Sequence, residues 1–247
     1  MPIRPSTAGL KTRSGRSTAD LSADRRPDQR QAWTVGPVLL GVFVVLFGLF
    51  ATESLTGLAQ EAELDSLQDV RAASPHPLYT ALRIVSAIGG GVGVTIVAIA
   101  VIGALSVRRR WQEAAIFALM MLGASLNGLL KALFDRPRPD LWTSPNPFSG
   151  LSFPSGHAMT SATLVAALVV LTWRTRWRLP VVIFGAVVVI AIGFSRLLLG
   201  AHYPSDVLGG WAFAFAWVSG VSLLLTKGRS PPAAPVPAQA ERRGPDS

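Results

Sequence analysis

The segment Ser195–Asp206, which reads SRLLLGAHYPSD, is the most informative part of the sequence because it joins two long apolar runs through ionisable residues. Those residues are Arg196, His202 and Asp206. Each flanking run is close to the ~20 apolar residues that a helix needs to cross the hydrocarbon core of a membrane. Ionisable side chains within membrane segments are energetically costly and mark functional sites. We therefore expect two membrane helices with a functional site at the surface where they meet.

Four further apolar stretches lie upstream, so the sequence predicts six membrane spans. They are residues 33–52, 84–107, 113–134, 156–173, 179–199 and 207–226. Half of the 247 residues are hydrophobic and only 15% are charged, with a mean hydropathy of +0.42. This composition is typical of a polytopic membrane protein and not of a soluble domain. The expected fold is all-α, a six-helix transmembrane bundle.

Two polar tails flank this expected bundle, which we assign to residues 32–227. Residues 1–31 are polar and rich in Arg, and residues 228–247 are polar and rich in Pro. Both compositions are typical of disordered segments. The first apolar stretch outlasts the roughly 7–15-residue core of a cleavable signal peptide. We therefore expect it to be an uncleaved membrane anchor.

The distribution of basic residues predicts the orientation in the cell membrane. Seventeen of the 23 Lys and Arg residues lie in the two tails and in the turns after spans 2 and 4, and six lie in the other segments. Because cytoplasmic segments carry the excess of positive charge, both termini are expected in the cytoplasm. The formal net charge of +9 is explained in this way. No basic stripe is interleaved with aromatic residues, so nucleic-acid binding is not expected.

Three polar segments fall at the ends of spans that then face outward. They are Lys131–Pro139, Pro154–His157 and Ser195–Asp206. Lys131, Arg138 and Arg196 can supply three cations to a phosphate group, and the planar guanidinium matches phosphate oxygens. The non-catalytic alternative is that Lys131 and Arg138 are interfacial anchors whose side chains extend to lipid headgroups.

Ser155 and Gly156 begin the fourth span and are expected to support anion binding. Ser155 suits the N-cap position of a helix, where backbone N–H groups lack intrahelical partners. Gly156 has no side chain, so a ligand oxygen can approach its backbone closely. The N-terminus of the span therefore favours a bound phosphate.

The spacing of His202 and Asp206 suits nucleophilic catalysis. If Asp206 lies in the first turn of the last span, its carboxylate can reach back to the imidazole and fix its tautomer. The second ring nitrogen is then free to attack phosphorus. His157 supplies a second imidazole that can protonate the leaving group. The simpler alternative for Asp206 is a helix cap.

The three segments, in this order, resemble the three-part signature of the type-2 phosphatidic acid phosphatase superfamily. The motifs are Lys-x6-Arg-Pro, Pro-Ser-Gly-His and Ser-Arg-x5-His-x3-Asp. The resemblance implies hydrolysis of a phosphomonoester or diphosphate through a phosphohistidine, without a metal or other cofactor. It implies His202 as nucleophile, Asp206 as its partner and His157 as general acid. The phosphate would be held by Lys131, Arg138, Ser155, Gly156, His157 and Arg196.

The function predicted from the sequence is an integral membrane lipid phosphatase whose site opens outward. Phosphatidic acid, phosphatidylglycerophosphate and an isoprenyl diphosphate all fit as substrates. A lipid phosphotransferase is one alternative, and a phosphate-binding transporter or flippase is another. The motifs also resemble those of vanadium-dependent haloperoxidases, but these are soluble, and six apolar spans argue against them. The chain has no cysteine and no metal-ligand spacing beyond the pair His202 and Asp206.

Three features lie outside the predicted catalytic motifs or have no predicted catalytic role. Arg136 is expected to form a local ion pair with Asp135. The acidic segment around Glu63 is expected to be an external loop. The run Gly89–Gly93 is expected to permit close helix packing and not to bind a dinucleotide, because it lies in an apolar run without a preceding strand.

Overall fold

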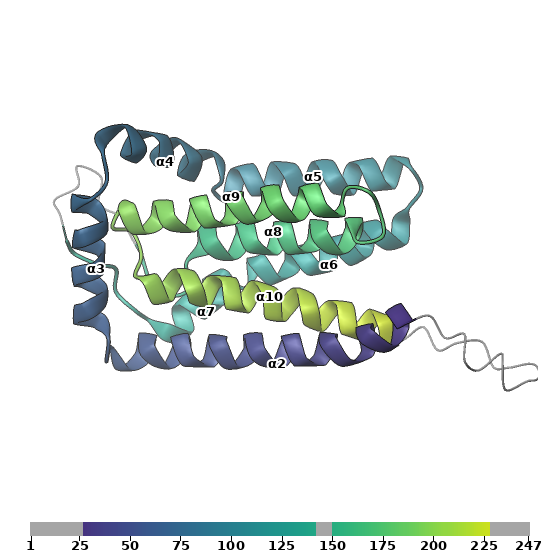
Figure 1. Ribbon diagram of the computed structural model, residues 1–247, viewed down its shortest axis with the longest axis horizontal. Coiled ribbons are helices and arrows are strands. Elements are labelled where there is room, and N and C mark those ends of the chain that lie inside the picture. The colour runs from purple at the N-terminus through teal and green to yellow at the C-terminus, as the bar shows by residue number, and fades with distance from the viewer. Residues whose placement is uncertain (1–26, 142–149, 228–247) are drawn as a thin grey trace, which may run out of the picture.

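The computed structural model describes residues 27–141 and 150–227, with side chains described from Gly36 to Leu225 within those ranges. All regular secondary structure in this part of the chain is helical (Figure 1). The helices are α2 (Pro27–Thr56), α3 (Gln60–Ala72), α4 (His76–Ile88), α5 (Gly91–Val107), α6 (Trp111–Ser125), α7 (Asn127–Phe134), α8 (Gly156–Thr172), α9 (Arg178–Leu198) and α10 (Pro204–Lys227). The predicted all-α class is confirmed for the described residues. The predicted disordered tails lie outside them, except that α2 begins at Pro27.

Four helical stretches are long and apolar enough to cross a membrane. They are Gly36–Thr56, Trp111–Phe134, Arg178–Leu198 and Pro204–Leu225. The pair α4 and α5 adds a fifth if it crosses as one span, bent by 47°. Helix α8 is apolar but has only 17 residues. The chain is therefore a multi-pass membrane protein, and the predicted number of six spans is not confirmed by helix length.

Helix α10 holds the bundle together by packing along α2 and α8 (Figure 1). Helix α8 in turn packs against α6 and α9. Gly210 brings α10 against the start of α8, because a Cβ at this position would lie only 3.0 Å from the carbonyl oxygen of Ser155. The absence of a side chain lets the two helices approach closely, and this approach positions the Pro154–His157 segment.

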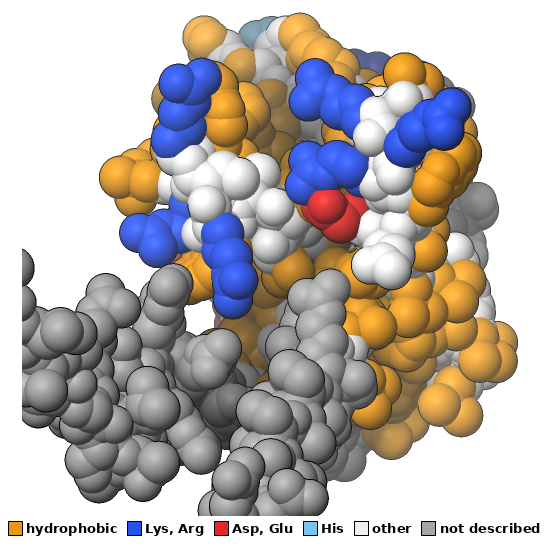
Figure 2. Space-filling view, turned by 90° about the vertical axis from the view of Figure 1, so that its right-hand side faces the viewer, with side chains coloured by type: hydrophobic (Ala, Val, Ile, Leu, Met, Phe, Trp, Pro, Cys, Tyr) orange, Lys and Arg blue, Asp and Glu red, His pale blue; other side chains and the backbone are white. Residues whose placement is uncertain are grey.

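The two ends of the bundle differ in charge. Helix α3 crosses one end, near the loop that joins α9 to α10 (left in Figure 1). The α5–α6 and α8–α9 turns lie at the other end, where Figure 2 shows a gathering of basic side chains around one acidic side chain. Exposed arginines in these turns are Arg108, Arg109, Arg110, Arg174, Arg176 and Arg178. The polar motifs and the basic turns therefore lie at opposite ends of the bundle.

Candidate active site

The loop between α9 and α10 brings His202 and Asp206 together. Gly200 adopts a φ of 62° just after α9 ends, a left-handed conformation that glycine tolerates best. Helix α10 begins at Pro204, so Asp206 lies in its first turn, as the sequence predicts. The Asp206 Oδ2 atom lies 3.3 Å from His202 Nδ1 and accepts a hydrogen bond of 2.8 Å from the backbone N–H of Tyr203. The carboxylate therefore reaches back to the imidazole.

The surroundings of His202 favour a neutral imidazole with a free lone pair. Burial lowers the pKa of His202 to about 3, since desolvation outweighs the hydrogen bond and the negative charge of Asp206. An ionised Asp206 accepts, so Nδ1 is assigned as the N–H donor. The Nε2 atom then carries the lone pair and lies 3.2 Å from Nη1 of Arg138. The ring is in the protonation state that a nucleophile requires.

Lys131 and Arg138 enter the site from α7 and the segment after it. Lys131 Nζ donates to the carbonyl oxygen of Leu151 and, at 3.3 Å, to that of Ser152. Arg138 Nη1 donates to the carbonyl oxygen of Ala201 at 2.7 Å. The positive charges of Arg138 and Arg196 act on the Lys131 ammonium. These like charges repel one another, so the cluster favours a bound anion.

Arg196 and His157 reach the site from α9 and α8. Arg196 is buried and donates to Ser86 Oγ at 2.7 Å. A Cβ on Gly90 would lie 2.9 Å from Nε2 of His157, so a glycine is needed for the imidazole to occupy this position. The charges of Arg196 and Arg138 act on His157. The break between α4 and α5 thus makes room for the second histidine.

The start of α8 differs from the expectation in one detail. Ser155 occupies the N-cap position but makes no side-chain capping bond. Its hydroxyl is buried and finds no hydrogen-bond partner among the described residues, while its backbone N–H donates to the carbonyl oxygen of Asp206 at 3.0 Å. A buried polar group without a partner is costly. Next to Gly156 and the helix N-terminus, the hydroxyl is available to an anionic ligand.

Two residues that the sequence analysis left without a role belong to this site. Arg136 is buried and pairs with Asp206 Oδ1 at 2.9 Å and with Glu63 Oε2 at 2.8 Å. The predicted local pair of Arg136 with Asp135 is therefore wrong. The acidic segment is not a loop but helix α3, and Glu63 is one of its two buried residues. Ser152 Oγ also donates to Asp206.

Part of this chain resembles known phosphatases in sequence. Residues 112–229 match the family model of the PAP2 superfamily. A lipid A 1-phosphatase of Rhizobium etli is 40% identical over 118 residues, which are 44% of this chain and 48% of that protein. The phosphatidylglycerophosphatase B of Bacillus subtilis is 33% identical over 110 residues, which are 42% of this chain and 54% of that protein. The matches thus span about half the length of these curated relatives.

A solved structure shows the same fold. The crystal structure of a transmembrane PAP2-type phosphatidylglycerolphosphate phosphatase from Bacillus subtilis superposes with a TM-score of 0.68. The superposition covers 76% of this chain and 96% of that chain, at 23% sequence identity. The likeness extends well upstream of residues 112–229.

Proposed function

We propose that this chain, whose residues 112–229 match the family model of the PAP2 superfamily, is an integral membrane lipid phosphatase. One observation carries the proposal. Lys131, Arg138 and Arg196 converge from three separate elements on the buried pair of His202 and Asp206. Transfer of a phosphoryl group needs fixed positive charge and accurate positioning, and this cluster offers both.

In the first half of the proposed reaction, the phosphoryl group moves to His202. The three cations, the Ser155 hydroxyl and the start of α8 hold the phosphate oxygens. Nε2 of His202 attacks phosphorus, and the bond from phosphorus to the lipid oxygen breaks. Asp206 stabilises the positive charge that develops on the ring, and His157 gives a proton to the leaving alkoxide.

In the second half, water releases the phosphate. His157, now neutral, takes a proton from a water molecule as this water attacks the phosphorus of the phosphohistidine. The N–P bond breaks, its electrons return to Nε2, and inorganic phosphate leaves. If an alcohol replaced water, the same intermediate would make the protein a phosphotransferase. Release of inorganic phosphate in water distinguishes the two outcomes.

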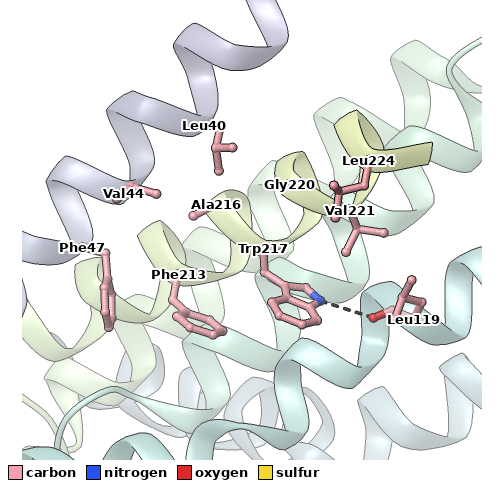
Figure 3. A pocket seen from close by; sticks show the side chains of 10 residues that line it. All are labelled: Leu40, Val44, Phe47, Leu119, Phe213, Ala216, Trp217, Gly220, Val221 and Leu224. Carbon is pink, nitrogen blue, oxygen red and sulfur yellow. Dashed lines mark hydrogen bonds between the residues drawn. The ribbon is translucent and has the colours of Figure 1, made fainter. Parts of the chain in front are cut away.

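An apolar groove supports a lipid as the substrate. It has a volume of about 430 Å³ and lies between α2, α6 and α10 (Figure 3). One end is formed by Phe47, whose ring centroid lies 5.9 Å from that of Phe153. Phe153 directly precedes the Pro154–His157 segment. A lipid tail in this groove would therefore end close to the phosphate site.

The proposed activity and the groove are tested together with a panel of lipid phosphates. Purified protein in detergent should release inorganic phosphate from phosphatidic acid, phosphatidylglycerophosphate or an isoprenyl diphosphate, and activity should survive chelators. Gly220→Leu should lower kcat/KM for a long-chain substrate by roughly tenfold, because a Cβ at Gly220 already lies 3.9 Å from Leu40. A short-chain analogue should lose less than about twofold.

Gly103→Leu is the matched control, because nothing lies within 4 Å of a Cβ at that position of α5. This variant should resemble the original protein on both substrates. No phosphate release from any member of the panel would overturn the proposed activity. Equal losses of kcat/KM on long-chain and short-chain substrates for Gly220→Leu would show that the groove does not bind the lipid tail.

We further propose that the bundle crosses the membrane six times, with α8 as the shortest span and the active site facing outward. The position of α8 between α6, α9 and α10 supports this, since neighbouring helices cover it. The six arginines of the α5–α6 and α8–α9 turns support a cytoplasmic location for that end.

The orientation is tested by labelling single cysteines, for which this cysteine-free chain is a clean background. Asp140 and Thr175 are both exposed. Asp140 directly follows the Lys131–Pro139 motif, and Thr175 lies in the basic turn between α8 and α9. Asp140→Cys should react with an impermeant maleimide in intact cells. Thr175→Cys should react only after the cells are permeabilised. The reverse pattern would contradict the proposed orientation.

A further inference from the structure

A buried chain of charges joins helix α3 to the catalytic carboxylate. The Arg136 guanidinium lies between Asp206 Oδ1, at 2.9 Å, and Glu63 Oε2, at 2.8 Å. Its side chain is only 2% exposed, and the ring centroid of Tyr203 lies 4.0 Å from its Cζ atom. Charges that are this deeply buried are tolerated only when each has a partner. The three residues therefore form one electrostatic unit.

Arg136 fixes the orientation of Asp206 from the side opposite to His202. The Oδ2 atom accepts from the Tyr203 backbone N–H at 2.8 Å and from the Ser152 hydroxyl, and it faces His202. Arg136 occupies the other oxygen, Oδ1. Without this second anchor, only the contacts at Oδ2 restrain rotation of the carboxylate relative to the imidazole.

Glu63 holds both Arg136 and the first turn of α10. Its Oε1 atom accepts a hydrogen bond of 2.7 Å from the backbone N–H of Ser205, and its Oε2 atom accepts from Arg136. The Ser205 N–H is one of the donors that a helix N-terminus leaves unpaired. Arg136 Nη1 also donates to Ser205 Oγ at 2.6 Å. One side chain of α3 thus supports both the guanidinium and the helix turn that carries Asp206.

We propose that Glu63 and Arg136 are positioning residues for phosphoryl transfer. Helix α3 then contributes to the active site through Glu63. The proposal rests on the proposed function. The charge of Glu63 offsets that of Arg136, so Asp206 keeps enough negative charge to stabilise the cationic ring of His202 as the N–P bond forms. Glu63 lies outside residues 112–229, which match the family model.

The test compares Glu63→Gln, Arg136→Met and the double variant on a short-chain diacylglycerol phosphate. Each single variant should lose thermal stability, because it leaves a buried charge without its partner. The double variant removes both charges of the Glu63–Arg136 pair and should regain part of that stability, because Asp206 keeps its contacts with Ser152, Tyr203 and His202. Its kcat should nevertheless stay about 10–100-fold below that of the unsubstituted protein. Losses of this size are typical when a residue that orients a metal-bound imidazole is removed. KM should change by less than about twofold, because the phosphate-binding cations are untouched.

Glu61→Gln is the matched control, since Glu61 lies on the exposed face of the same helix. It should leave kcat, KM and stability unchanged. If kcat recovers together with stability in the double variant, Glu63 and Arg136 are structural only and the inference is wrong. If the unsubstituted protein releases no phosphate, the proposed function itself is wrong. The two failures can therefore be told apart.

Discussion

Replacing His202 with alanine is expected to remove phosphatase activity whatever the leaving group, by about 10⁴-fold or more. The reason is its position: Nε2 lies 3.2 Å from Arg138, Nδ1 lies 3.3 Å from Asp206, and the ring is buried. If this ring forms the covalent bond to phosphorus, a substrate with a better leaving group cannot compensate for its loss.

His157→Ala is expected to behave differently, because a general acid matters most when the leaving group is poor. On a lipid phosphate the loss should be about 10²–10⁴-fold. On dinitrophenyl phosphate, whose leaving group departs without a proton, the loss should be much smaller. Some loss on both substrates is expected, since His157 also lies within reach of the cationic charges of Arg138 and Arg196.

The measurement is kcat/KM for both variants on a lipid phosphate and on the aryl phosphate. Thermal unfolding in detergent serves as the control that both variants are folded. Equal proportional losses for His157→Ala on the two substrates would make it a binding residue and not an acid. Rescue of His202→Ala, with none for His157→Ala, would mean that the two roles are reversed.

The second large effect is expected for Asp206→Asn, which keeps the shape of the side chain but removes its charge. The carboxylate accepts hydrogen bonds from Arg136, Ser152 and the backbone of Tyr203, besides its contact with His202. An amide has one acceptor oxygen and turns two donors toward groups that also donate. We expect kcat to fall by about 10³–10⁴-fold, as in catalytic triads that lose the carboxylate beside their histidine.

Asp206→Asn should also destabilise the fold, because Arg136 loses one of its two buried partners. Breaking a buried ion pair from one side costs about 3–5 kcal/mol, and the remaining contact with Glu63 should keep the effect near the lower bound. Thermal unfolding and kcat are measured together. Asp140→Asn, at an exposed position, should change neither. An Asp206→Asn variant with nearly full kcat would show that the carboxylate does not assist His202.

The sequence predicted the parts of the site that depend on short spacings. His202 and Asp206 are four residues apart at a helix start that Pro204 marks, so their contact followed from local geometry. The hydrogen bond of 3.1 Å from Asn127 to the Pro154 carbonyl joins α7 to the segment before α8 and does not follow from such a short spacing. The order of the three motifs carried the family resemblance.

The contacts of Glu63 could not be predicted, because they join residues far apart in the chain. Its partners Arg136 and Ser205 lie 73 and 142 residues away. A local signal was nevertheless present. Glu63 and Leu67 are four residues apart and are the buried residues of α3, and a carboxylate on the apolar face of an amphipathic helix needs a buried partner.

The breaks within the predicted spans were missed for a different reason. Hydropathy measures how apolar a stretch is but not whether its helix is continuous. Residues 84–107 read as one apolar span, yet Gly89 and Gly90 end α4 and begin α5 at an angle. Both glycines are needed for close approach, since Cβ atoms there would meet Ile192 at 2.3 Å and His157 at 2.9 Å.

The proposed transfer of a phosphoryl group to His202 can be observed by trapping the phosphohistidine. Purified protein is mixed with a ³²P-labelled lipid phosphate and quenched in alkali, in which phosphohistidine is stable, and the labelled peptide is identified by mass spectrometry. The label should lie on His202, resist alkali, be lost in acid and be absent from His202→Ala. Label on Ser155 or His157, or turnover by a protein that never becomes labelled, would show that His202 is not the nucleophile.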